Sequence, residues 1–175
     1  MSKKIPSIIS LLAPIISILA VAVAFGNVSK AADTSVVTAT VTVQNISVEM
    51  VANSTISYGT IGTQSTQETT TNGLSTTPVA NNNGNVTEDL SVKSQNSASW
   101  TLSSDTTANN YFHKVCNASC TTTGSWEFMT TSYLQVHNAV AASNSQPFDL
   151  RIGTPVTTAS YTQQSVDVTV QAAAD

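Results

Sequence analysis

Two cysteines and two histidines are the residues of this 175-residue chain best suited to chemistry. Cys116 and Cys120 are the only cysteines, and their spacing predicts a disulfide that closes a small loop. A loop this short gains about 2 kcal/mol in the chain-entropy model, so the expected role of the bond is to fix a loop tip. A redox-active pair, or a metal site shared with His113, is the sharper alternative, but four good metal ligands are missing.

Hydrolytic chemistry would require His113 or His137 beside an activated serine and a carboxylate. Serines are so frequent that finding one near a histidine carries no information, and neither a G-x-S-x-G elbow nor an H-E-x-x-H zinc motif is present. We therefore expect both histidines to be exposed or half-buried. The sequence predicts no catalytic residues and no cofactor.

Glu88 and Asp89 follow an asparagine-rich run, residues 81–85. Oxygen ligands in such a turn could hold calcium, but the EF-hand spacing is absent and we favour a solvated turn. The two acids are adjacent in a predicted strand, so their side chains point to opposite faces and cannot act together as a glycosidase pair.

Aromatic and asparagine side chains offer two other kinds of site. Trp100, Tyr111 and Trp126 are candidates for glycan contact if they are exposed, although core packing is the commoner role of tryptophan. Four N-x-[ST] sequons become glycosylation sites if the host glycosylates exported proteins. Their asparagines are Asn45, Asn53, Asn85 and Asn117.

The beginning of the chain predicts export. Lys3 and Lys4 precede an uncharged apolar run, residues 5–25, which is typical of a signal peptide. Small-x-small cleavage motifs end at Ala24 and Ala31, and we favour the later one because a strand pattern starts just beyond it. An uncleaved anchor is the alternative, since a spanning helix needs about 20 apolar residues. Either outcome places the remainder outside the cell, secreted or at the cell surface.

The predicted organisation is therefore a signal peptide over residues 1–31 and one mature domain over residues 32–175. Three of the six basic residues leave with the leader, so three remain against all ten acidic residues, a net charge of −7. Such an acidic chain is a poor partner for nucleic acid or anionic lipid. Membrane contact is expected only through an uncleaved leader.

Alternating apolar residues predict β-strands along the mature chain. Val37, Ala39, Val41 and Val43 alternate with threonines, which is the period of a strand. The alternation continues over residues 46–50 after a phase shift that predicts a bulge or a crossing between sheets. Further strands are predicted within residues 56–61, 86–92, 100–102, 111–115, 126–136, 148–152 and 166–170. Eight or nine short strands predict an all-β fold, a two-sheet β-sandwich of Greek-key, jelly-roll or Ig-like type.

Two segments resemble known families. Residues 83–92, NGNVTEDLSV, resemble the N-x-G-N-V…L-x-V segment of Ig-like and jelly-roll domains in prokaryotic surface proteins. Residues 148–152 and 165–170 are similar to the closing strands of such domains. With an export signal followed at once by a strand, the layout is similar to secreted fibre-forming proteins of the camelysin and TasA-like type. That resemblance implies an extracellular structural protein.

A second resemblance concerns cell-wall binding. Ile56-Ser57-Tyr58-Gly59 followed by Trp100-Thr101-Leu102 resembles half of a WxL wall-binding domain. Val168-Thr169-Val170 stands where the second Trp-x-Leu would be, so this pattern is incomplete.

The leading hypothesis is a non-catalytic structural protein of the cell surface or extracellular matrix, whose partners are surface or matrix components and the chain itself. The strand directly after the predicted cut could add to the sheet edge of a neighbouring subunit. It could also pair within its own sheet. A module that binds cell wall or glycan is the alternative function, and a secreted enzyme is the least favoured.

Overall fold

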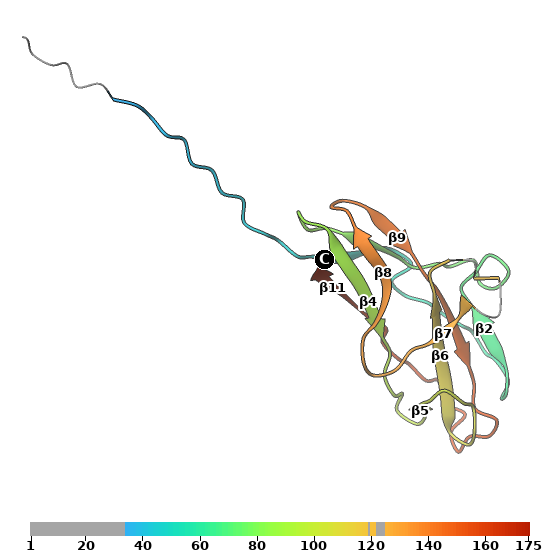
Figure 1. Cartoon of the computed structure of the whole chain (residues 1–175). Coiled ribbons are helices and arrows are strands. Elements are labelled where there is room, and N and C mark those ends of the chain that lie inside the picture. The colour runs from blue at the N-terminus through green and yellow to red at the C-terminus, as the bar shows by residue number, and fades with distance from the viewer. Residues whose placement is uncertain (1–33, 119, 122–124) are drawn as a thin grey trace, which may run out of the picture. The chain divides into compact units, whose positions relative to one another are not determined.

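The computed structural model describes residues 34–118, 120–121 and 125–175, and these residues form an all-β fold without an α-helix. They contain eleven strands, where eight or nine were predicted (Figure 1). The strands are β1 (Val48–Ala52), β2 (Thr66–Glu68), β3 (Val79–Asn82), β4 (Glu88–Lys93), β5 (Thr101–Leu102), β6 (Asn110–Cys116), β7 (Glu127–Phe128), β8 (Leu134–Val140), β9 (Ser145–Pro147), β10 (Asp149–Gly153) and β11 (Thr169–Ala174).

The strands are arranged in three sheets. Their orders are β1-β3-β9, then β2-β10-β6-β5 with β7 also paired to β6, and β11-β4-β8. Every pair is antiparallel except β5 with β6, which is parallel. The predicted all-β class is confirmed, although three sheets are present where two were predicted.

The chain divides into two compact units, residues 1–41 and residues 42–175. All eleven strands belong to the second unit. Of the first unit only residues 34–41 are described, and they are exposed and contain no strand. The predicted signal peptide, residues 1–31, lies outside the described residues. The described residues include no helix long and apolar enough to span a bilayer.

The core of the second unit is built by strands that alternate between buried and half-buried residues. β4 lies between β11 and β8 and buries Glu88, Leu90 and Val92. β6 buries Tyr111, His113 and Val115 in the same way. Further buried apolar residues complete this core, namely Ala80, Met129, Val136, Val140, Phe148 and Leu150. Period-two alternation therefore predicted correctly that Leu90 and Val92 share one face of β4.

Two predicted strands are absent. Residues 37–43 were predicted as a strand, but residues 34–47 contain none. Residues 56–61 were also predicted as one, and they carry no strand assignment either. The predicted strand over residues 166–170 begins at Thr169, later than expected. Alternation specifies two faces, but a strand also requires a neighbour for its backbone groups, and these segments have none among the described residues.

Candidate interaction site

The N-terminal segment, defined as residues 34–43, exposes a set of large apolar side chains. The exposed fractions are 88% for Val36, 90% for Val37, 90% for Val41 and 79% for Val43. Apolar residues occur singly on most protein surfaces, whereas a contiguous apolar stretch usually marks an interaction site. The segment is therefore the first component of the candidate site.

A group of hydrogen bonds, which we call the tether, holds the residues between this segment and β1. Asn45 N–H donates to Asn85 Oδ1 at 2.7 Å, and Asn85 Nδ2 donates to the carbonyl of Val43 at 2.8 Å. The backbone N–H of Asn85 also donates to the carbonyl of Asn45 at 3.0 Å. Residues 43–45 are therefore fixed to the turn between β3 and β4.

Glu88 forms the buried end of the tether. It is 0% exposed, and its Oε1 accepts the Ser47 N–H at 2.8 Å. Its other oxygen has no hydrogen-bond partner among the described residues. Gly84 allows this close approach, because a Cβ there would collide with the Glu88 carboxylate and the Asn45 carbonyl. The turn was predicted to be solvated, whereas its acid is internal and supports the backbone before β1.

The open flank is the second component, and it consists of residues 54–61 and residues 161–168. The first segment follows β1, and the second leads into β11. Neither makes a backbone-to-backbone hydrogen bond among the described residues. β1 and β11, which these segments continue, contact each other. The flank is therefore an edge of the fold whose backbone makes few hydrogen bonds, among them one from Gln164 Nε2 to the Thr162 carbonyl.

A buried polar network lies beneath the open flank. The Tyr58 hydroxyl bonds to Nε2 of His113 at 3.1 Å, and Nδ1 of His113 bonds to Oγ of Ser94 at 3.1 Å. The hydroxyl of Tyr111 donates to the carbonyl of Gln95. This network attaches residues 54–61 to β6 through side chains alone.

The network is electrically neutral at physiological pH. Burial lowers the pKa of His113 to about 4, because a charged imidazole would lose its hydration. Burial, together with the nearby Tyr111, raises the pKa of the Tyr58 hydroxyl. His113 was expected to be exposed or half-buried and is 2% exposed, so that prediction is wrong. The phase of β6 places it on the inward face with Tyr111 and Val115.

The histidines are not arranged for hydrolysis. Ser94 reaches His113, but the other ring nitrogen of that histidine bonds to Tyr58, where a triad would require a carboxylate. His137 is half-buried and bonds to the carbonyl of Pro147 at 2.9 Å. Among the described residues, no three His, Cys, Asp or Glu side chains gather as metal ligands.

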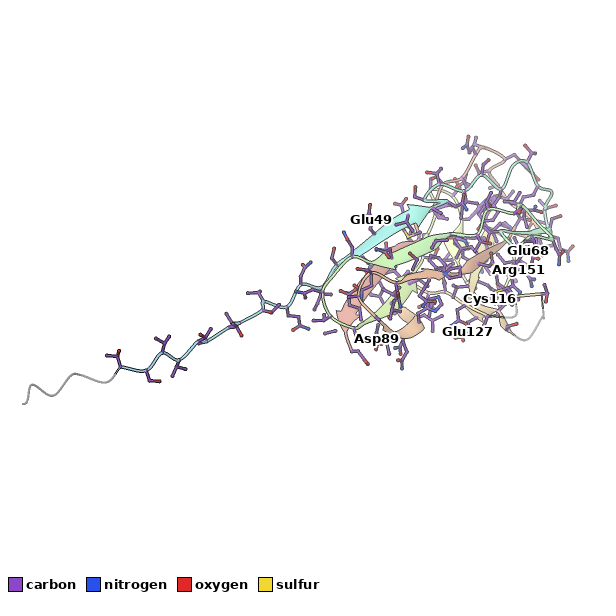
Figure 2. The ribbon with its side chains drawn as sticks, turned by 90° about the horizontal axis from the view of Figure 1, so that it is seen from above. Glu49, Glu68, Asp89, Cys116, Glu127 and Arg151 are labelled. Carbon is purple, nitrogen blue, oxygen red and sulfur yellow. A yellow bond between two sulfur atoms is a disulfide. The ribbon has the colours of Figure 1, made fainter. Side chains whose placement is uncertain are left out.

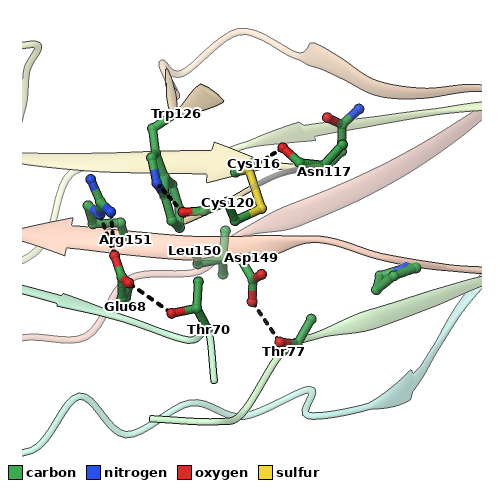
Figure 3. Close-up of a disulfide and its surroundings, with 12 residues drawn as sticks. Glu68, Thr70, Thr77, Cys116, Asn117, Cys120, Trp126, Asp149, Leu150 and Arg151 are labelled. Atoms are coloured by element: carbon green, nitrogen blue, oxygen red, sulfur yellow. Dashed lines mark hydrogen bonds and ion pairs between the residues drawn. A yellow bond between two sulfur atoms is a disulfide. The ribbon is translucent and has the colours of Figure 1, made fainter. Parts of the chain in front are cut away.

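The predicted disulfide between Cys116 and Cys120 is present (Figure 3). It lies beside a solvent-open cavity of about 240 Å³, lined in part by Thr70, Asn117 and Phe148. The described residues that line this cavity present hydroxyl, amide and apolar groups and the carboxylate of Asp149, but no basic side chain. The Cys116–Cys120 disulfide is consistent with a structural role at a loop tip.

The three aromatic candidates for glycan contact lie in different environments. Tyr111 is 0% exposed and Trp126 is 5% exposed, so these rings belong to the interior. Nε1 of Trp126 donates to the carbonyl of Cys120, and Arg151 lies 4.1 Å from its ring centroid. Trp100 is half-buried and donates from Nε1 to Thr158.

A second surface carries aromatic and basic side chains that sequence reasoning did not select. We call Phe112, Lys114, Phe128 and Arg151 the aromatic–basic face. The Nζ of Lys114 lies 4.0 Å from the ring centroid of Phe128, which is 40% exposed. Arg151 forms an ion pair with Glu68 at 2.5 Å. Figure 2 shows Glu68 and Arg151 well separated from Glu49 and Asp89.

The four sequon asparagines differ in how their side chains are used. Nδ2 donates to a backbone carbonyl in three of them, from Asn53 to Thr77, from Asn85 to Val43 and from Asn117 to Val136. Asn45 is exposed, and its side chain makes no hydrogen bond among the described residues. It is therefore the sequon most accessible to modification in the folded chain.

Comparison with known proteins finds no match. No family model matches the chain, and neither does any curated protein or solved structure.

Proposed function

We propose that the chain is a non-catalytic structural protein of the cell surface or extracellular matrix that assembles with itself. In this proposal the N-terminal segment of one copy adds as a strand to the sheet of the next copy. The observation that carries it is the alternating segment of residues 34–43, which is exposed and unpaired at a position where the sequence has the pattern of a strand.

Burial of apolar surface supplies the driving force. Val36, Val37, Val41 and Val43 are almost wholly exposed in the single chain. Fully burying a valine side chain contributes about 1.5–3 kcal/mol, so covering even three of them contributes several kcal/mol. The interspersed threonines suit the other face of a half-buried strand.

Other features support the extracellular setting of this proposal. A disulfide is characteristic of oxidising compartments, and the Cys116–Cys120 bond is compatible with export. Cleavage of the predicted leader after Ala31 would leave the N-terminal segment close to the new N-terminus of the mature chain. The scaffold we propose for the assembly is a β-sandwich formed from the three sheets.

Electron microscopy and sedimentation of the exported form test the proposal. Protein beginning at residue 32 should form filaments or oligomers, whereas protein beginning at residue 44 should remain monomeric. Its thermal midpoint should change little, because it loses only the bond from Asn85 to the Val43 carbonyl. Val41→Asp should prevent assembly, and Thr40→Asp on the opposite face is the matched control that should retain it. Monomers from every form, in all conditions, would refute self-assembly.

A binding module for anionic glycan or cell wall is a second candidate, favoured by the aromatic–basic face. The mature chain is predicted to retain only three basic residues, and two of them, Lys114 and Arg151, lie on this face. Retention on peptidoglycan or an acidic polysaccharide that is lost in Phe128→Ala would support it. No retention of the unaltered protein on either would eliminate it.

A further inference from the structure

We infer that the open flank is the acceptor for the N-terminal segment of a second copy. This inference rests on the proposed self-assembly and specifies where the added strand pairs. It predicts that residues 35–43 of one copy bond to the backbone of residues 54–61 and 161–168 of another.

Unused backbone groups are the first observation. Residues 54–61 and 161–168 make no backbone-to-backbone hydrogen bonds among the described residues. Both segments nevertheless alternate between half-buried and exposed positions, as a sheet edge does. Ile56 and Tyr58 are half-buried in the first, and Val166 and Val168 in the second. Each segment therefore presents half-buried side chains to the core on a backbone that lacks a neighbour, although residues 54–61 bend at Gly59, whose φ is +73°.

Incomplete burial of the flanking strands is the second observation. Apolar residues of β1 and β11, and of the segments that continue them, pack against the core but remain only partly buried. These residues are Val48, Met50, Ile56, Val168, Val170 and Ala172. A strand with one apolar face would extend their burial and satisfy the free backbone groups together.

The N-terminal segment fits this acceptor in pattern and charge. Nine residues, 35–43, span about 30 Å when extended, which is enough to run along residues 54–61, whose chain bends at Gly59. Val37, Ala39, Val41 and Val43 would face the core. Neither residues 35–43 nor residues 54–61 contain a charged side chain, and the one charged residue of 161–168, Asp167, is exposed.

The tether fixes the point at which the N-terminal segment leaves the fold. It holds Val43, Asn45 and Ser47 against residues 83–88. Residues 34–41 are exposed in the single chain, so a second copy is the proposed source of the added strand.

Hydrogen–deuterium exchange with a donor peptide tests the acceptor. Full mature Val41→Asp protein, which cannot donate its own strand, is mixed with a peptide of residues 34–44. We expect exchange within residues 54–61 and 161–168 to slow at least tenfold. A peptide with Thr38→Asp and Thr40→Asp should protect the same segments, whereas one with Val37→Asp and Val41→Asp should not.

The outcomes separate this inference from the proposed function. Protection by the peptide at a different edge, such as β8 or β2, would overturn the acceptor while leaving strand addition intact. Absence of peptide binding, together with absence of filaments from the unaltered protein, would overturn both. Protection of residues 54–61 in the unaltered monomer at high dilution would show that the segment pairs within its own chain and would also overturn the inference.

Discussion

The N-terminal segment and β4 carry the same kind of sequence pattern but have opposite environments. In β4, Leu90 and Val92 are 0% exposed, and the strand is paired on both sides, with β11 and β8. In the N-terminal segment, Val37 and Val41 are each 90% exposed. The difference teaches that alternation determines the faces of a strand, whereas its neighbours determine whether the strand forms.

The largest expected effect on monomer stability separates these two regions. Leu90→Ala should lower the free energy of unfolding by about 2–5 kcal/mol, because it leaves a cavity in the core. Val41→Ala should change it by less than about 0.5 kcal/mol, as for a surface position. Urea denaturation of both variants at a concentration where the chain is monomeric measures this. A large loss in Val41→Ala would show that the segment packs within its own chain.

The pH dependence of stability should come mainly from His113, in the second unit. The pKa of His113 in the folded protein, about 4, lies below the usual 6.5, so at intermediate pH the unfolded chain binds a proton that the folded protein excludes. Stability should therefore fall as pH decreases, by roughly 2 kcal/mol between pH 7 and pH 5.

Denaturation at several pH values checks this dependence. Protein beginning at residue 44 should show the same slope as the full mature chain, and His113→Gln should flatten it. His137→Gln is the matched control and should keep most of the slope. His137 is only half-buried, and although burial lowers its pKa, its hydrogen bond to the Pro147 carbonyl acts in the opposite direction. A slope that survives His113→Gln would place the proton uptake elsewhere.

The smallest expected effect concerns the junction between the two regions. Asn85→Ala removes two hydrogen bonds, to Asn45 N–H and to the Val43 carbonyl, and should cost about 1 kcal/mol since the site is exposed. Amide exchange at Asn45 should accelerate while exchange in β4 stays unchanged. Asn53→Ala, which also breaks one side-chain bond to a carbonyl, is the control that should leave Asn45 unaffected. An unaltered Asn45 rate in Asn85→Ala would contradict the tether.

The sequence predicted β6 and β10 well, because alternating residues along each strand were sufficient to locate them. The strand predicted over residues 111–115 is β6, Asn110–Cys116, and that predicted over residues 148–152 is β10, Asp149–Gly153. The disulfide also followed from the only two cysteines. These features depend on local spacing, which a sequence displays directly.

Features that depend on distant partners could not be predicted. The burial of His113 requires Tyr58 and Ser94, which are 55 and 19 residues away in the chain. The tether joins Asn45 to Asn85, 40 residues apart. Its sequon marked Asn85 as a possible glycosylation site. Nothing in the local sequence indicated that the Asn85 side chain bonds to Val43 and Asn45. The open flank likewise follows from missing backbone bonds, which sequence patterns do not reveal.

Amide exchange within the N-terminal segment itself tests the central claim most directly. Residues 37–43 should exchange at the rate of an unstructured peptide in dilute monomer and become strongly protected in the assembled protein, while β4 is protected in both. Protection of residues 37–43 already in the monomer, or free exchange of them within assemblies, would contradict the claim that this segment is a strand completed by another copy.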